Sequence, residues 1–124
     1  KNWTVDYSGA WGVVLNPLTK RAYGPLSYDD DPNRVAIIDY TVGRRDTAVA
    51  ISGYAEGIGA NPTTNVVFVP TDVGIDVVSG DLPGRVLTLF RPMSTRGPGV
   101  AINRVTGRVY MADPASNRVV VIQN

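Results

Sequence analysis

Three adjacent carboxylates, Asp29, Asp30 and Asp31, come nearest in this sequence to the residue types and spacing of a metal site. Carboxylate oxygens, with nearby amide oxygens such as that of Asn33, are ligands that a hard cation such as Ca²⁺ prefers. The Asp-x-Asp-x-Asp-Gly spacing of a dedicated calcium loop is absent, because the three residues are consecutive. We therefore expect either a calcium site or a solvated turn that ends at Pro32. The sequence predicts no other cofactor.

Most enzyme mechanisms lack their usual residues in this chain. Its 124 residues include no Cys and no His, which removes thiolate nucleophiles, Cys-based metal sites and the commonest general base. The serines have no histidine to activate them, and no Ser-x-x-Lys occurs. A metal-assisted reaction at the three aspartates stays open as the alternative. The composition favours a non-enzymatic role.

Basic residues are the second candidate, because arginine makes bidentate contacts to carboxylates and phosphates. The chain has 12 Lys and Arg against 11 Asp and Glu, so no overall excess favours nucleic acid or an anionic membrane. No stretch approaches the roughly 18 consecutive apolar residues that a membrane-spanning helix needs. A docking surface would therefore require a local concentration of charge, which depends on how the strands place the loops.

Three segments repeat one pattern, and this repeat predicts the elements. Each segment reads Gly, three small or apolar residues, Asn, two variable residues, Thr and then an apolar–aromatic pair. The segments are 12–23, 57–68 and 99–110. The spacing of their Asn residues falls within the roughly 40–45 residues of one four-stranded propeller blade.

Turn residues divide each repeat into short strands. Asn can hydrogen-bond the backbone two residues on, so the Asn-x-x-Thr stretch predicts a hairpin turn. Lys20, Asn65 and Gly107 then take the position expected to be left-handed, which suits Gly and Asn but strains Lys. Gly24-Pro25 is also predicted to be a turn. The predicted strands are 13–15, 22–23, 35–39 and 47–51, then 58–60, 66–69, 74–78 and 85–90, then 100–102, 109–112 and 119–122.

The strand order is phase-shifted. With the strands of a repeat lettered a to d, the chain reads d-abcd-abcd-abc, because residues 2–6 precede the first repeat as a fourth strand precedes the second. No window shows helical periodicity, so the fold class is all-β. We expect one domain over 1–124: a strand in 1–7 that completes another blade, blades at 8–51 and 52–90, and an incomplete blade at 91–124.

The third repeat shows the pattern most fully, with Gly99, Asn103, Thr106 and Tyr110 followed by Asn-Arg-Val-Val-Val-Ile at 117–122. It resembles the β-propeller repeats named after Tyr-Val-Thr-Asn (YVTN), and the likeness extends along nearly the whole chain. The family occurs in secreted and surface proteins of bacteria and archaea, so the resemblance implies an extracellular, cell-surface or periplasmic location. Its shared residues are turn and core residues, so it implies a fold and no activity.

Three blades do not close a ring, because propellers usually have four to eight. Two copies would make six blades, with residues 2–6 of each chain pairing with 119–122 of the other. Alternatively, the chain is part of a longer propeller or of another assembly. The expected partner is a second copy or the remainder of a larger propeller or complex.

The predicted topology gives the two ends of the sheets different charges, because a–b and c–d turns share one end and b–c and d–a turns share the other. Two acidic residues, Asp46 and Asp81, accompany the basic residues of the first end. These are Lys20, Arg21, Arg44, Arg45, Arg85, Arg104 and Arg108. The other end holds six acidic residues and four basic ones. This polarity is either solubilising charge or a docking surface for an acidic protein, polymer or headgroup layer.

The sequence thus predicts a non-enzymatic scaffold that assembles with itself or a larger complex and docks a partner through its basic end. The alternative is part of a metal-assisted propeller enzyme with its site in the central channel. Some lyases and lactonases look similar at the level of one blade, but none of their catalytic motifs can be matched here. No basic stretch is interleaved with aromatic residues, so nucleic acid is not the expected partner.

Overall fold

A computed structural model describes residues 12–26, 33–55, 57–81, 86–89 and 99–123, with the backbone alone at 86–89. Within these ranges the regular structure consists of eleven β-strands and one 3₁₀ turn, η1 (Pro114–Ser116). The all-β expectation is therefore confirmed. In the same ranges, no helix is long and apolar enough to span a membrane.

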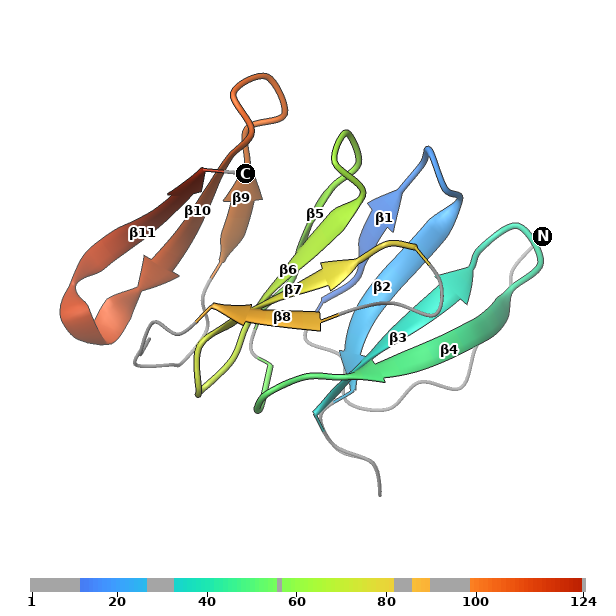
Figure 1. Cartoon of the computed structure of the whole chain (residues 1–124), viewed down its shortest axis with the longest axis horizontal. Coiled ribbons are helices and arrows are strands. Elements are labelled where there is room, and N and C mark those ends of the chain that lie inside the picture. The colour runs from blue at the N-terminus through green and yellow to red at the C-terminus, as the bar shows by residue number, and fades with distance from the viewer. Residues whose placement is uncertain (1–11, 27–32, 56, 82–85, 90–98, 124) are drawn as a thin grey trace.

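The strands form three antiparallel sheets of consecutive strands, which lie side by side (Figure 1). Sheet 1 contains β1 (Val14–Asn16), β2 (Arg21–Leu26), β3 (Arg34–Asp39) and β4 (Arg44–Ala50). Sheet 2 contains β5 (Gly59–Asn61), β6 (Val66–Pro70), β7 (Ile75–Ser79) and β8 (Val86–Leu89). Sheet 3 contains β9 (Val100–Ile102), β10 (Arg108–Asp113) and β11 (Arg118–Gln123).

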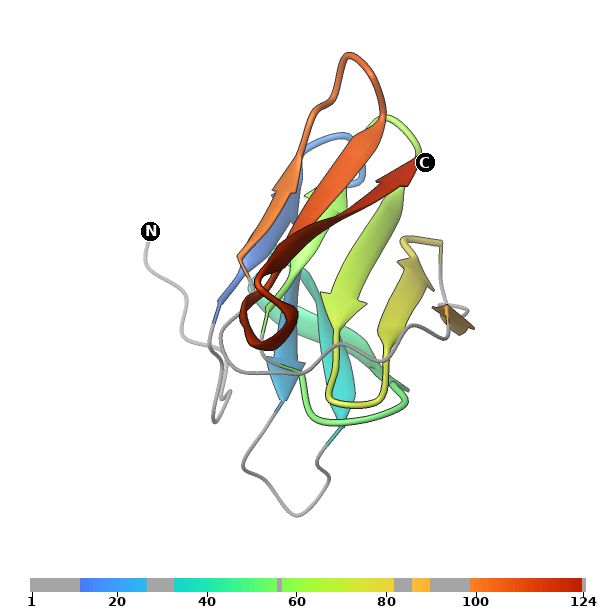
Figure 2. The same cartoon turned by 90° about the vertical axis from the view of Figure 1, so that its left-hand side faces the viewer.

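The first strand of each sheet is an edge strand, and the three first strands are neighbours, because β1 contacts β5 and β5 contacts β9. The hairpin turns β1–β2, β5–β6 and β9–β10 point to one end of the sheets, which is uppermost in both Figure 1 and Figure 2. The β6–β7 and β10–β11 connections lie at the opposite end (Figure 1). The sheets therefore have two distinct ends, as the strand order predicted.

The three hairpin turns are built alike. In each, the Asn side-chain oxygen accepts the backbone N–H two residues on, at 3.0 to 3.1 Å: Asn16 from Leu18, Asn61 from Thr63 and Asn103 from Val105. The predicted left-handed position is confirmed, with φ of 56° at Lys20, 53° at Asn65 and 72° at Gly107. The Asn-x-x-Thr stretch thus specifies the backbone at three places with one mechanism.

The prediction of a turn at Gly24-Pro25 is wrong, because both residues lie within β2. Pro25 pairs with Val35 of β3. On its other side β2 pairs with β1 only from Arg21 to Tyr23, so the missing N–H of Pro25 breaks no ladder bond there. Pro70 ends β6 in the same way, beyond the last residue that pairs with β5.

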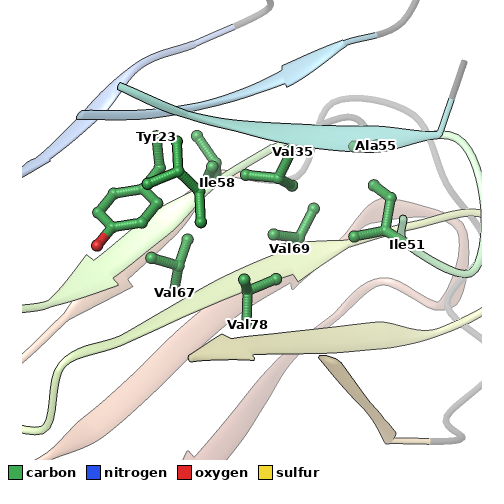
Figure 3. Packing of buried hydrophobic residues seen from close by; sticks show 9 residues of the cluster. Tyr23, Val35, Ile51, Ala55, Ile58, Val67, Val69 and Val78 are labelled. Atoms are coloured by element: carbon green, nitrogen blue, oxygen red, sulfur yellow. The ribbon is translucent and has the colours of Figure 1, made fainter. Parts of the chain in front are cut away.

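Two apolar layers hold the sheets together. In the first, sheet 1 packs on sheet 2 through Tyr23, Val35 and Ile37 on one side and Val67, Val69 and Val78 on the other (Figure 3). Ile51, Ala55 and Ile58, from the connection between the sheets, complete this layer. In the second, Phe68 and Ile75 of sheet 2 pack on Val109, Met111 and Val120 of sheet 3. Successive side chains of β6 enter different layers, so sheet 2 is covered on both faces.

Candidate functional site

The predicted basic residues gather at the end of the sheets that carries the hairpin turns (Figure 1). Six of the seven are described, whereas Arg85 lies outside the described residues. The six are called the basic end below: Lys20, Arg21, Arg44, Arg45, Arg104 and Arg108. They come from sheets 1 and 3, since sheet 2 has Asn65 and Val66 where sheet 1 has Lys20 and Arg21.

Arg44 and Arg45 differ from their prediction in one respect, because they begin β4 instead of lying in the turn before it. The register between β3 and β4 shifts between Ile37 and Ile38, and Arg45 pairs with Ile38 while Arg44 pairs with Asp39. This irregularity extends the strand beyond the predicted start at Thr47. Both arginines remain exposed.

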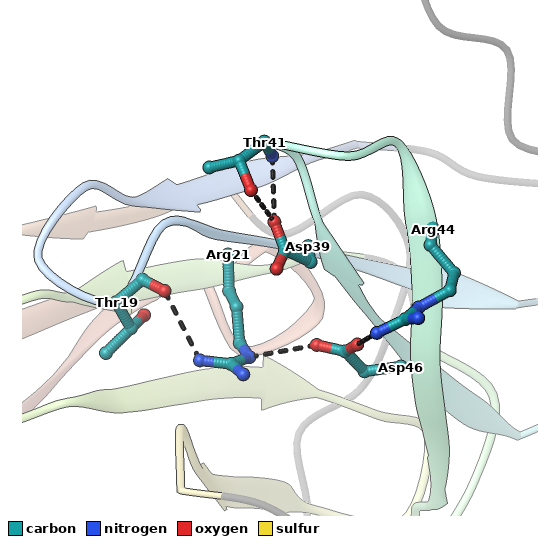
Figure 4. A network of polar contacts seen from close by, with 6 residues as sticks. All are labelled: Thr19, Arg21, Asp39, Thr41, Arg44 and Asp46. Carbon is teal, nitrogen blue, oxygen red and sulfur yellow. Dashed lines mark hydrogen bonds and ion pairs between the residues drawn. The ribbon is translucent and has the colours of Figure 1, made fainter.

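Asp46 neutralises part of the basic end (Figure 4). Its Oδ2 accepts a hydrogen bond from Arg21 Nε at 3.2 Å, and its Oδ1 accepts one from Arg44 Nη2 at 3.5 Å. Arg21 Nη1 also donates to the Thr19 carbonyl at 3.3 Å. None of the ion pairs among the described residues involves Lys20 or Arg45, and both side chains are exposed.

Asp39 also lies at this end and is absent from the charged residues predicted for it. Its Oδ1 accepts hydrogen bonds from Thr41 Oγ1 at 2.6 Å and from Thr41 N at 2.8 Å (Figure 4). These two bonds lower the pKa of Asp39 below its usual value, because they favour the ionised carboxylate. The Asp-x-Thr spacing after a predicted strand is the signal that could have found it. Asp39, Asp46 and Asp81 together balance half of the six basic charges.

A polar network joins the turns of sheets 1 and 2 beneath the basic end. Asn16 Nδ2 donates to Asn65 Oδ1 at 2.7 Å, and Asn65 Nδ2 donates to Asp81 Oδ1 at 2.9 Å. Burial raises the pKa of the neighbouring Tyr23, an effect that the Thr19 hydroxyl and Arg21 partly offset. Neither Tyr23 Oη nor Thr19 Oγ1 makes a hydrogen bond of good geometry within the described part of the chain.

The second candidate surface is an exposed apolar face of sheet 3. It is called the outer face below and consists of Ala101, Tyr110, Ala112, Val119 and Val121. The strand register places them side by side, since Tyr110 lies opposite both Ala101 and Val121, and Ala112 lies opposite Val119. Alternate residues of the same strands, such as Val109 and Val120, face sheet 2 instead. The repeat predicted that a strand at 119–122 pairs with residues 2–6 of another copy, but it did not predict this face.

An ion pair borders the outer face at the β10–β11 turn. Arg118 Nε donates to Asp113 Oδ2 at 2.8 Å. Burial acts to raise the pKa of Asp113, but the hydrogen bonds from Arg118 and Ser116 outweigh it and hold the pKa below its usual value. A hollow of about 290 Å³ lies between this pair, Ala112 and Val119.

A further hollow of about 290 Å³ lies among β1, β5 and β9, the first strands of the three sheets. Leu15, Ala60, Ile102 and the basic Arg104 contribute to its lining. Its described lining contains no carboxylate and no nucleophile beside a base, so it offers no acid–base constellation. Asp29, Asp30 and Asp31 lie outside the described residues. Among the residues that the structure describes, no group of three carboxylates is placed to hold a metal ion.

The fold and these two surfaces define an all-β chain of three stacked antiparallel sheets. No family model matches the sequence, and no curated protein matches it. Among solved structures, it is similar to PorZ, an essential bacterial surface component of the type-IX secretion system of Porphyromonas gingivalis. The identity is 16%, the TM-score is 0.49, and the match covers 93% of this chain but 16% of PorZ. At this distance no shared family, activity or location follows.

Proposed function

We propose that this chain is a non-enzymatic β-propeller module that docks an acidic protein or polymer through its basic end. The observation that carries the proposal is the gathering of six basic residues from four chain segments, 20–21, 44–45, 104 and 108, at one end of the stacked sheets. Only one of the nearby carboxylates, Asp46, forms ion pairs with them in the described residues. The remaining positive charge faces solvent, where it would attract an anionic surface.

Three features support the interpretation of the sheets as consecutive blades. Each sheet is built from consecutive antiparallel strands, neighbouring sheets stack face to face, and the first strands meet around a hollow. In this proposal the blades correspond to 8–51, 52–90 and 91–124, and two copies close a six-bladed ring or further blades complete a larger one. The predicted strand in 1–7 lies outside the described residues.

The extracellular, cell-surface or periplasmic location implied by the repeat resemblance belongs to the same proposal. The metal-assisted enzyme stays a hypothesis without a supporting observation, because its aspartates are not among the described residues.

Retention on immobilised poly-glutamate tests the docking proposal. The double variant Arg45→Gln with Arg104→Gln removes two exposed charges from the basic end. We expect it to elute at a lower salt concentration than the unchanged chain, because exposed charges act through a screened field.

A matched control changes the net charge equally at the other end of the sheets. Ala50→Glu with Ala115→Glu adds two negative charges there, at exposed positions. The proposal requires a smaller loss of retention from this control than from the arginine variant. Equal losses, or no retention of the unchanged chain at low salt, would show that the charge polarity has no docking role.

A further inference from the structure

The outer face of sheet 3 has counterparts on sheets 1 and 2. The register fixes the equivalence: Tyr23 lies opposite Ile37, Phe68 opposite Val77, and Tyr110 opposite Val121. Each aromatic residue also lies opposite a residue in the first strand of its own sheet; these residues are Val14, Gly59 and Ala101. The three aromatic residues therefore occupy one position of the repeat.

Burial separates the third aromatic residue from the first two. Tyr23 is 0% exposed and Phe68 is 2% exposed, because the following sheet covers each of them. Tyr110 is only half-buried. In the described part of the chain, no sheet follows sheet 3 to cover it.

The third strands show the same contrast. A second position of the repeat is occupied by Val35, Ile75 and Val119. Each of them pairs with the residue that follows the aromatic residue by two places on the neighbouring strand. Val35 and Ile75 are 0% exposed, whereas Val119 is 62% exposed. Val121, the next residue on the outer face, is 50% exposed. Four residues of the outer face thus retain the apolar character of a buried layer without being buried, namely Tyr110, Ala112, Val119 and Val121.

We infer that a second copy of this chain packs a β-sheet against the outer face of sheet 3. The inference rests on the proposed function, because it names the surface through which the module assembles. A sheet of this same repeat covers each of the two buried counterparts, and a second copy supplies such a sheet. The net charge of +1 opposes the approach of two copies only weakly.

Two features of the outer face suit such a docking. The shallow hollow beside Ala112 and Val119 can receive a side chain of the incoming sheet. The edge strand β11 pairs only with β10 among the described strands. An apolar face beside an open strand edge invites unspecific association, and a defined partner packed on the face removes that exposed apolar surface from solvent.

The absence of cysteine from the chain makes the test direct, because one introduced Cys reports on one position. The variant Val121→Cys places the thiol on the outer face, and Leu18→Cys places it in the β1–β2 turn, where Leu18 is 72% exposed. The rate of alkylation by iodoacetamide is measured from submicromolar to high micromolar protein. Circular dichroism establishes that both variants keep their β-structure.

The inference predicts that alkylation of Val121→Cys slows at least about tenfold as the concentration rises, as expected for a thiol covered in a complex. Leu18→Cys should keep its rate. Equal, concentration-independent rates at both positions would overturn the inference.

The two proposals fail separately. Adding Arg45→Gln and Arg104→Gln to Val121→Cys should leave the protection intact while retention on poly-glutamate falls. Protection without retention contradicts only the docking function, and retention without protection contradicts only the inferred interface.

Discussion

The side chains of Asn16 and Asn65 join two sheets directly, with Asn16 Nδ2 donating to Asn65 Oδ1 at 2.7 Å. Asn65 has a left-handed backbone, with φ of 53°, and its own Nδ2 donates to Asp81. A Cβ at Gly80 would overlap Asn65 Oδ1, so the Asn65 side chain fills the space that this glycine leaves. One residue thus shapes a turn and links the ends of sheets 1 and 2.

Replacing Asn65 separates these two roles. Asn65→Gly keeps the left-handed backbone but loses both side-chain hydrogen bonds, and we expect it to lower the free energy of unfolding by about 1 kcal/mol. Asn65→Ala also strains the backbone, and the loss should rise to about 2–3 kcal/mol. Urea denaturation of both variants measures the difference. An Asn65→Ala variant as stable as Asn65→Gly would show that the backbone strain is negligible.

Lys20 and Gly107 occupy the same turn position, and their substitutions should have opposite effects. Lys20→Gly removes a left-handed residue with a Cβ and should stabilise the chain by up to about 1 kcal/mol, after the entropy of glycine is subtracted. Gly107→Ala introduces that strain and should destabilise it by about 1–2 kcal/mol. Thermal unfolding of the two variants provides the measurement. Changes of the same sign would contradict the shared turn geometry.

These turns were predictable because their mechanism is local. Asn16, Asn61 and Asn103 specify the hairpins through hydrogen bonds that span two residues, and the sequence shows each spacing. The strand starting at Arg44 could not be predicted, because its length depends on a register shift between Ile37 and Ile38 of the neighbouring strand.

Tertiary burial also could not be predicted from the sequence. The alternation in 118–123 indicates two faces, but no local signal tells that Val120 faces sheet 2 while Val119 and Val121 stay exposed.

The basic end could be predicted because the strand order alone assigns each turn to one end of the sheets. Its pairing through Asp46 depends on side-chain geometry, which strand order does not determine.

Tyr23 should make stability depend on alkaline pH. Burial raises its pKa above 10.0, so the folded state keeps a proton that the unfolded state loses once the pH exceeds that value. The free energy of unfolding therefore falls as the pH rises from about 10 towards the folded pKa. Tyr23→Phe should remove this fall and, by deleting a buried hydroxyl without a good hydrogen bond, stabilise the chain at pH 7 by about 1 kcal/mol.

Urea denaturation of Tyr23→Phe and of the unchanged chain, from pH 7 to pH 11, checks both statements. Parallel stability profiles over this range would mean that Tyr23 titrates alike in the folded and unfolded states. A loss of stability at pH 7 would mean that its hydroxyl has a partner.

The mass of the native particle tests most directly the central claim that the chain assembles through an apolar face that its described sheets leave uncovered. Sedimentation equilibrium at micromolar concentration measures it without a partner or a substitution. The account predicts a folded particle of twice the chain mass of 13.3 kDa. A stable, folded species of 13.3 kDa that persists as the concentration rises would contradict the account.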